Sequence, residues 1–356
     1  MGKTVVLTGG GTAGHVMPNL AILPKLKAMG FSVEYIGTQD GMEKEIIGAT
    51  GIPYHVISAG KLRRYLSIKN LTDLARVMKG CCQAKSVLKK IKPDVVFSKG
   101  GFVSVPVVIA ASRLKIPVVL HESDMTPGLA NRLCIPRADK VCVAFEPTLK
   151  HVPAGKGVYT GLPIRTALLH GDRQKGLEFC GFSGRKPVML IMGGSMGAKA
   201  VNDALDAVMP ELTERFDVAH IRGRGNMLDC CEGKGYVQFS FVDAELPDLY
   251  AAADVMISRA GATAVFEILA LTMPALLVPL SKASSRGDQI LNAAYFEEKG
   301  FSLVLQQEDL APEAIIRAAE ELYTKRETLR AAMKREAVGD AAEHVAEIIA
   351  EAAKRA

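Results

Sequence analysis

Short apolar runs alternate with longer stretches in which apolar residues recur at helical spacing. The runs are apolar at consecutive positions, which is typical of parallel strands that are buried on both faces. Together these patterns predict an α/β fold of parallel sheets flanked by helices. The predicted strands are 4–8, 32–36, 94–97, 117–120, 141–144, 188–192, 218–221, 255–257 and 275–278. The predicted helices are 18–29, 70–91, 128–135, 198–214, 263–271 and 289–299, followed by a helical segment at 311–355.

The alternation is interrupted near residues 159–164, where Gly161 and Pro163 break both the strand pattern and the helix pattern. A chain of 356 residues also exceeds the usual size of one hydrophobic core, so two domains of roughly 150–200 residues are expected. We therefore expect an N-terminal domain at 1–162 and a C-terminal domain that begins at 163.

Three glycine-rich turns each follow a predicted strand, at 9–15, 100–104 and 193–198. The first and third open helical patterns and lie about half the chain apart. Backbone N–H groups at a helix N-terminus, with the positive end of its dipole, bind anions without a cationic side chain. The pattern therefore predicts one phosphate-type site in each half, as in an enzyme that holds a nucleoside diphosphate and a second substrate.

The first turn also matches the Gly-x-Gly-x-x-Gly fingerprint of dinucleotide-binding proteins, which alone is weak evidence. That fingerprint expects an acidic residue at the end of the second strand. Here the strand at 32–36 continues into Gly37 and Thr38, and the next acid is Asp40. A nicotinamide cofactor is therefore disfavoured, and we expect no cofactor.

Individual side chains near these turns are candidates for proton transfer or for binding phosphate and sugar. His15 stands in the first turn of a predicted helix, where the dipole favours the neutral, proton-accepting imidazole, although a capping or packing role would also fit. Ser195 and Arg165 suit contacts with a diphosphate, although a tight structural turn at 193–195 and a surface arginine at 165 would also fit. Glu267 either complements a helix dipole or holds ribose hydroxyls, and the amide of Gln289 suits a sugar.

Charge is distributed unevenly along the chain. Residues 1–160 carry 22 Lys and Arg against 10 Asp and Glu, whereas the remainder is net acidic. Within 60–92, ten basic residues face a single acid, Asp73, and are interleaved with apolar residues. This stretch is either a solvated helix face or a surface that meets anionic lipid. Nucleic acid is disfavoured as a partner because aromatic residues are few.

Seven cysteines include no Cys-x-x-Cys pair. Adjacent cysteines at 81–82 and 230–231 are poorly placed to share a zinc ion. We therefore expect reduced, structural thiols in a cytosolic protein, and no metal site.

Taken together, the motifs resemble those of the MurG family, the UDP-N-acetylglucosamine–N-acetylmuramyl-(pentapeptide) pyrophosphoryl-undecaprenol N-acetylglucosamine transferases. The resemblance covers nearly the whole chain, and its motifs occur in the right order and spacing. They are 10–21, 100–106, 121–124, 193–198, 260–267 and 289–292.

The resemblance implies a GT-B glycosyltransferase fold, in which a cleft separates two Rossmann-like domains. The C-terminal domain, 163–340, would hold UDP-GlcNAc. The N-terminal domain, 1–162, rejoined by a C-terminal helix at about 341–356, would face the acceptor and the membrane. The implied reaction is inverting, metal-independent transfer of GlcNAc to the C4 hydroxyl of MurNAc in lipid I, which gives lipid II for peptidoglycan synthesis.

The same resemblance implies a peripheral protein at the cytoplasmic face of the cell membrane. Its expected partners are UDP-GlcNAc, lipid I, an anionic membrane surface and other cell-wall synthesis proteins. Three readings compete with this one: a lipid glycosyltransferase with a different acceptor, a UDP-GlcNAc 2-epimerase, and a nucleotide-binding scaffold without catalysis.

By position, the resemblance assigns roles to single residues. Ser195 and Arg165 would meet the diphosphate, Glu267 the ribose, and Gln289 the GlcNAc. Val242 would meet uracil through its backbone, and Ala262 and Thr263 of the 260–267 motif are further expected contacts. In the N-terminal domain, Thr12, Ala13, Gly14 and His15 would border the donor sugar and the acceptor.

The general base is the least settled of these assignments. We favour His15, with Asp124 as its rival. Asp124 stands where the family often has Asn, so it could accept the proton itself or orient His15. Phe102 replaces a frequent Tyr, which leaves an acceptor contact there in doubt. The chain departs from the family pattern at two further positions: Ala13 stands where Gly is common, and Met196 stands where Gln is common. Both turns keep their neighbouring small residues, so a phosphate site formed by backbone N–H groups is retained.

Overall fold

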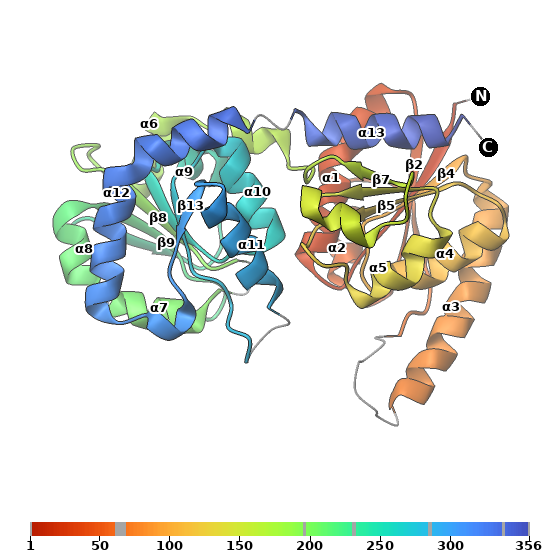
Figure 1. Cartoon of the computed structure of the whole chain (residues 1–356), viewed down its shortest axis with the longest axis horizontal. Coiled ribbons are helices and arrows are strands. Elements are labelled where there is room, and N and C mark those ends of the chain that lie inside the picture. The colour runs from red at the N-terminus through yellow and green to blue at the C-terminus, as the bar shows by residue number, and fades with distance from the viewer. Residues whose placement is uncertain are drawn as a thin grey trace. The chain divides into compact units, whose positions relative to one another are not determined.

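The computed structural model describes residues 2–60, 69–194, 197–229, 233–283, 287–336 and 339–354. It divides into two compact units (Figure 1). Unit 1 comprises Met1–Arg165 and Val338–Ala356, and unit 2 comprises Thr166–Ala337. This division lies three residues beyond the boundary expected at 162.

Unit 1 is built on a parallel sheet of seven strands in the order β3-β2-β1-β4-β5-β6-β7. The strands are β1 (Thr4–Thr8), β2 (Ser32–Gly37), β3 (Tyr54–Val56), β4 (Val95–Ser98), β5 (Val118–Glu122), β6 (Lys140–Val143) and β7 (Gly157–Tyr159). Its α-helices are α1 (Ala13–Ala28), α2 (Met42–Gly48), α3 (Lys69–Ile91), α4 (Ser104–Arg113), α5 (Leu129–Cys134) and α13 (Ala341–Ala352).

Both faces of this sheet are covered, because successive strand residues belong to different hydrophobic clusters. Val5 and Leu7 pack with residues of α1 and α13, whereas Val6 packs with residues of α3 and α4. Figure 1 shows α13 lying along this unit, and Lys3 Nζ donates to the carbonyl of Ala353 at 2.7 Å. The C-terminal helix therefore completes the N-terminal core.

Unit 2 has a parallel sheet of six strands in the order β10-β9-β8-β11-β12-β13. The strands are β8 (Val188–Met192), β9 (Asp217–Ile221), β10 (Tyr236–Phe239), β11 (Val255–Ser258), β12 (Ala275–Leu277) and β13 (Ser302–Val304). Its α-helices are α6 (Arg173–Cys180), α7 (Lys199–Asp206), α8 (Met209–Arg215), α9 (Leu246–Ala252), α10 (Ala262–Leu271), α11 (Asp288–Glu298) and α12 (Pro312–Arg335).

Some predicted helices differ from those observed. The helix expected at 18–29 begins at Ala13, so Pro18 lies inside it. The helix expected at 198–214 is two helices, and Pro210 stands in the first turn of the second, where its missing N–H costs no hydrogen bond. The helical segment at 311–355 is likewise two helices, α12 and α13.

Candidate functional site

The glycine-rich turns lie at the carboxyl ends of central strands. In unit 1 the chain leaves β1 toward β2 and β3 on one side and returns to β4 on the other. In unit 2, β8 likewise lies between β9 and β11. Open parallel sheets bind ligands outside the carboxyl ends of strands at such reversal points. The turns after β1, β4 and β8 are therefore where each unit offers a site.

The two turns of unit 1 touch each other. Gly101 has φ +82°, and a Cβ there would lie 2.3 Å from the carbonyl oxygen of Gly10 and 3.3 Å from His15 Nδ1. Gly11 packs on Phe102, since its Cβ would lie 2.6 Å from the ring carbon Cε1. Side chains at these glycines would push the turns apart, so glycine is what lets both backbones border His15.

His15 is half-buried in the first turn of α1, and its Nδ1 lies 3.0 Å from Thr12 Oγ1. Thr12 is the N-cap residue, yet its hydroxyl makes no capping hydrogen bond. In the tautomer in which Nδ1 donates to Thr12, Nε2 carries the lone pair that a general base needs. Ala13 and Gly14 complete this first turn, whose backbone N–H groups begin the helix.

Glu43 of α2 is the acidic residue that supports the first turn, and sequence reasoning missed it. The residue is fully buried. Its Oε2 accepts from the backbone N–H of Gly11 at 3.2 Å, and its Oε1 accepts from the N–H and hydroxyl of Thr38 at 3.2 and 2.5 Å. Asp40, the first acidic residue after the second strand, is exposed.

Asp124 lies in a turn held by Glu122, the last residue of β5. The Glu122 carboxylate accepts from the backbone N–H of Asp124 at 3.0 Å, from that of Gly128 at 3.1 Å and from Asn131 Nδ2 at 2.9 Å. Asp124 itself is half-buried. The fixed turn therefore presents Asp124 at the same edge of the sheet as the glycine turns.

In unit 2, Ser195 and Met196 lie outside the described residues, so the diphosphate turn is seen only at its two ends. Gly197 has φ +72°, and a Cβ there would lie 2.2 Å from the carbonyl oxygen of Arg222. The turn therefore rests directly on the chain that follows β9.

Four buried side chains form a closed hydrogen-bonded ring under this turn. Arg222 Nη1 donates to the Tyr236 hydroxyl at 3.2 Å, which donates to His220 Nδ1 at 3.1 Å. His220 Nε2 donates to Asn202 Oδ1 at 3.2 Å, and Asn202 Nδ2 donates to the carbonyl of Arg222 at 3.0 Å. The donors in this ring are those of a neutral His220, and burial followed by the charge of Arg222 lowers the pKa of this imidazole to about 3.

Asp206 anchors the same arginine to α7. Its two carboxylate oxygens accept from Arg222 Nη1 and Nη2 at 2.6 and 2.8 Å. The Arg222 side chain is only 2% exposed. The helix that begins after the diphosphate turn is thus fixed to β9 by a paired, two-point ionic contact.

The expected ribose and sugar residues lie on α10 and α11. Ala262 and Thr263 form the first turn of α10 after its N-cap, Gly261. Glu267 lies one turn further along and accepts from the Tyr250 hydroxyl at 3.0 Å. Gln289 begins α11, where its Oε1 accepts from the N–H of Leu280 at 3.0 Å. Its Nε2 faces Gly261, 4.0 Å from where a Cβ would lie.

Val242 and Arg165 complete the expected set. Val242 follows β10 and is 7% exposed, so its backbone rather than its side chain is what it can offer. The neighbouring Phe241 is 49% exposed, and the guanidinium of Arg224 lies 5.1 Å from its ring centre. Arg165 is half-buried and is the last residue of the first segment of unit 1.

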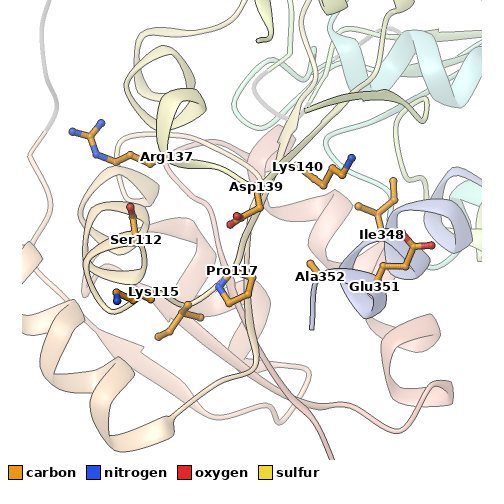
Figure 2. Close-up of a pocket in the computed structure, with 10 residues that line it drawn as sticks. Ser112, Lys115, Pro117, Arg137, Asp139, Lys140, Ile348, Glu351 and Ala352 are labelled. Carbon is orange, nitrogen blue, oxygen red and sulfur yellow. The ribbon is translucent and has the colours of Figure 1, made fainter. Parts of the chain in front are cut away.

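A cavity of about 320 Å³ in unit 1 lies elsewhere (Figure 2). It is bordered by Pro117 and Lys140, at the amino ends of β5 and β6, and by Ile348 of α13. The glycine turns lie at the opposite, carboxyl ends of the strands, so this cavity is separate from the candidate site.

The described residues contain neither a metal-binding cluster nor a membrane-spanning helix. No group of three or more His, Cys, Asp or Glu side chains there is arranged to hold a metal ion. Within the same residues, no helix combines the length and apolar character needed to cross a membrane.

Family models match both units. Residues 5–143 match the glycosyltransferase family 28 N-terminal domain, and residues 188–351 match the glycosyltransferase family 28 C-terminal domain. The crystal structure of Acinetobacter baumannii MurG superposes with a TM-score of 0.77 at 26% identity, covering 98% of this chain and 99% of that one. With the two parallel-sheet units, these matches confirm the predicted GT-B fold.

Curated relatives match over nearly their full length. A Lachnoclostridium phytofermentans protein is 53% identical over 350 residues, which cover 98% of this chain and 99% of the relative. A Lachnospira eligens protein is 55% identical over 325 residues, or 91% and 92%. Both are named UDP-N-acetylglucosamine--N-acetylmuramyl-(pentapeptide) pyrophosphoryl-undecaprenol N-acetylglucosamine transferase. This chain therefore belongs to the MurG family of N-acetylglucosamine transferases.

Proposed function

We propose that this protein transfers GlcNAc from UDP-GlcNAc to the C4 hydroxyl of MurNAc in lipid I, which gives lipid II for peptidoglycan synthesis. The observation that carries this function is more than 50% identity, over nearly the whole chain, to transferases named for these substrates. Glycine-rich turns at the carboxyl ends of central strands in both units support it, because each unit can then hold one of two phosphorylated substrates.

The donor is assigned to the expected C-terminal domain, 163–340, which includes unit 2 and Arg165. The turn at 193–198 with Ser195, and Arg165, would hold the diphosphate, and Glu267 would hold the ribose. The orientation of Glu267 is already set by Tyr250, which is the preorganisation that a binding carboxylate needs. The other proposed donor contacts are the backbone of Val242 with uracil, the first turn of α10 at Ala262 and Thr263, and Gln289 with the sugar.

The acceptor is assigned to unit 1, where His15 and Asp124 compete for the role of base. The C4 oxygen bonds to the anomeric carbon from the face opposite UDP, and the bond from that carbon to the diphosphate oxygen breaks. The electron pair of the broken bond leaves with UDP, and the proton of the C4 hydroxyl passes to the base. Helix N-termini and Arg165 would stabilise the departing charge. We favour His15, because its contact with Thr12 can direct the lone pair of Nε2 outward.

A membrane-bound acceptor requires that the protein reach the membrane surface. We propose that α3 provides this contact with anionic lipid and places the protein peripherally at the cytoplasmic face, among other cell-wall synthesis proteins. Met78, Cys82, Lys85 and Lys89 are all exposed and follow one another at helical spacing, so they lie on one face of α3. Met78 is 65% exposed, the highest value among the exposed large apolar side chains of the described residues, so this face offers an apolar group beside its two lysines.

The test is transfer of radiolabelled GlcNAc from UDP-GlcNAc to a short-chain lipid I analogue in the presence of EDTA. A β-linked product supports donor, acceptor and metal independence together. Comparing His15→Ala with Asp124→Asn then identifies the base. Tight UDP binding without product would overturn the acceptor and favour a lipid glycosyltransferase with another acceptor.

A further inference from the structure

Glu43 is a fully buried carboxylate that joins the first glycine turn to the end of the neighbouring strand, β2. It lies in the first turn of α2, after the N-cap Gly41. Its Oε2 accepts from the backbone N–H of Gly11 at 3.2 Å. Its Oε1 accepts from the backbone N–H and from the hydroxyl of Thr38, the residue that follows β2. Burying a carboxylate is costly unless it is hydrogen-bonded, and these donors supply the partners that it requires.

The backbone on both sides of this carboxylate packs directly against it. A Cβ at Gly10 would lie 2.6 Å from Cδ of Glu43, and a Cβ at Gly41 would lie 2.3 Å from the same atom. Glycine at both positions therefore lets two backbone segments close over one side chain. Because no other side chain separates the carboxylate from the turn, a change in the shape or hydrogen bonding of residue 43 reaches the turn directly.

Hydrogen bonds hold the turn at its first and last glycines. The hydroxyl of Tyr35, a fully buried residue of β2, donates to the carbonyl of Gly9 at 2.6 Å. The hydrogen bond to Glu43 holds Gly11, two residues later. Glycine has more backbone freedom to lose on folding than any other residue, so a run of three glycines needs such contacts to take one conformation. Glu43 thus fixes the end of the turn that leads into Thr12.

Thr12 connects this end of the turn to His15. Its carbonyl accepts from the backbone N–H of His15 at 3.1 Å, and its Oγ1 lies 3.0 Å from His15 Nδ1. The Thr12 hydroxyl makes no capping hydrogen bond with α1, so the usual N-cap contact does not fix this residue. Thr12 therefore depends on the preceding residue, Gly11. The path from Glu43 to the candidate base consists of one hydrogen bond, one residue of backbone and one side-chain contact.

We infer that Glu43 is a positioning residue for the transfer reaction. Its carboxylate fixes Gly11 and thereby Thr12, so that the Thr12 hydroxyl holds the imidazole of His15 in the tautomer that offers Nε2 as the base. Glu43 touches no substrate in this role and acts through Thr12. The inference deepens the proposed function and rests on it. It gives a task to a buried carboxylate that lies outside all the glycine-turn motifs of the sequence.

The experiment compares Glu43→Met with the matched control Thr38→Val. Glu43→Met removes both hydrogen-bonding oxygens and keeps a side chain of similar length. Thr38→Val removes the hydroxyl that donates to Oε1 and leaves the contact of Oε2 with Gly11. Both variants should lower the Tm, but only Glu43→Met should lower kcat, about ten- to a hundredfold, as expected when a base leaves its productive geometry. The Kd for UDP should be unchanged in both, because the donor is assigned to the C-terminal domain.

Nuclear magnetic resonance of the His15 ring nitrogens gives a readout that a purely structural role would not change. His15→Gln identifies the signals. In the wild type and in Thr38→Val, the tautomer with the proton on Nδ1 should predominate, and in Glu43→Met the population should shift toward the proton on Nε2. Thr12→Val should produce the same shift. Adding Glu43→Met to Thr12→Val should then lower kcat little further, because both changes act through one contact.

Two results would overturn the inference. One is the same distribution of His15 tautomers in the wild type and in Glu43→Met, and the other is an equal loss of kcat in Glu43→Met and Thr38→Val. If Glu43→Met does not fold, Glu43→Gln replaces it: the amide offers one oxygen to two sets of donors, so a smaller shift of the same tautomers should appear, and its absence would equally refute the role. If the wild type transfers no GlcNAc to lipid I, the proposed function fails, and the tautomer comparison still tests the contact.

Discussion

The hydroxyl of Tyr250, on α9, donates a hydrogen bond to Oε2 of Glu267, on α10, at 3.0 Å. Tyr250 is 2% exposed, so the donor is fixed in the core while the acceptor lies at the surface of unit 2. A carboxylate oriented in this way can bind two ribose hydroxyls without first losing rotamer freedom. The relationship ties the proposed ribose-binding residue to a residue of the core of unit 2.

Tyr250→Phe should therefore weaken UDP binding about three- to tenfold, which corresponds to one net hydrogen bond. Glu267→Ala should weaken it further, because the ribose contact itself is lost. Isothermal titration calorimetry with UDP measures both. Tyr323→Phe, on α12, is the matched control and should leave the Kd unchanged. Wild-type affinity in both Tyr250→Phe and Glu267→Ala would show that Glu267 does not hold the ribose.

Thr12→Val tests the tautomer of His15. The substitution keeps the side-chain shape but removes the oxygen that lies 3.0 Å from Nδ1. Because the Thr12 hydroxyl does not cap α1, helix stability should change little. We expect kcat to fall about tenfold, part of the usual effect of a general base, while the UDP affinity is unchanged. Thr12→Ser should restore kcat, and equal kcat values for Val and Ser would exclude this role.

The buried pair of Arg222 and Asp206 should contribute far more stability than an exposed pair on the same helix. Asp206→Asn removes the counter-charge of an arginine that is 2% exposed, which should cost about 3 kcal/mol of unfolding free energy. Asp203→Asn removes the partner of Lys199, whose side chain is 79% exposed, and should cost less than about 0.5 kcal/mol. Urea unfolding compares the two, and similar losses would contradict the anchoring role.

His220 should make unit 2 sensitive to acid. Its pKa falls from 6.5 to about 3 in the folded protein, so between these pH values the unfolded chain binds more protons. Stability is then fully present above pH 6.5 and decreases as pH falls, by up to about 1.4 kcal/mol per pH unit. The difference in unfolding free energy between wild type and His220→Gln should shrink from pH 7 to pH 4. Parallel pH curves would show that folding does not lower the pKa of His220.

The sequence pattern predicted the central strands of both sheets and missed four strands. Those four, β3, β7, β10 and β13, are the two edges of each sheet. Edge strands are only three or four residues long here, and ten of their thirteen residues are at least partly exposed, so no continuous apolar run marks them. Central strands are buried on both faces, so each is a continuous apolar run that can be recognised in the sequence.

The candidate site likewise contains residues that the sequence could predict and residues that it could not. The glycine turns and His15 were predictable, because a turn between a strand and a helix is a local pattern. Glu43 was not, because its role depends on hydrogen bonds with Gly11 and Thr38, which the fold brings to one point. A charged residue that is buried by distant segments leaves no local signal of its burial.

The exposed face of α3 should mediate binding to anionic lipid. Lysines near lipid headgroups contribute about 1 kcal/mol each, and reversing a charge replaces attraction with repulsion. Lys85→Glu/Lys89→Glu should therefore weaken co-sedimentation with phosphatidylglycerol vesicles at least about tenfold, and high salt should weaken the wild type in the same way. Lys44→Glu/Lys150→Glu carries the same change in net charge on other exposed residues of unit 1 and should bind nearly as the wild type does. If both double variants lose binding equally, only the net charge of the unit attracts lipid and α3 is not the contact surface.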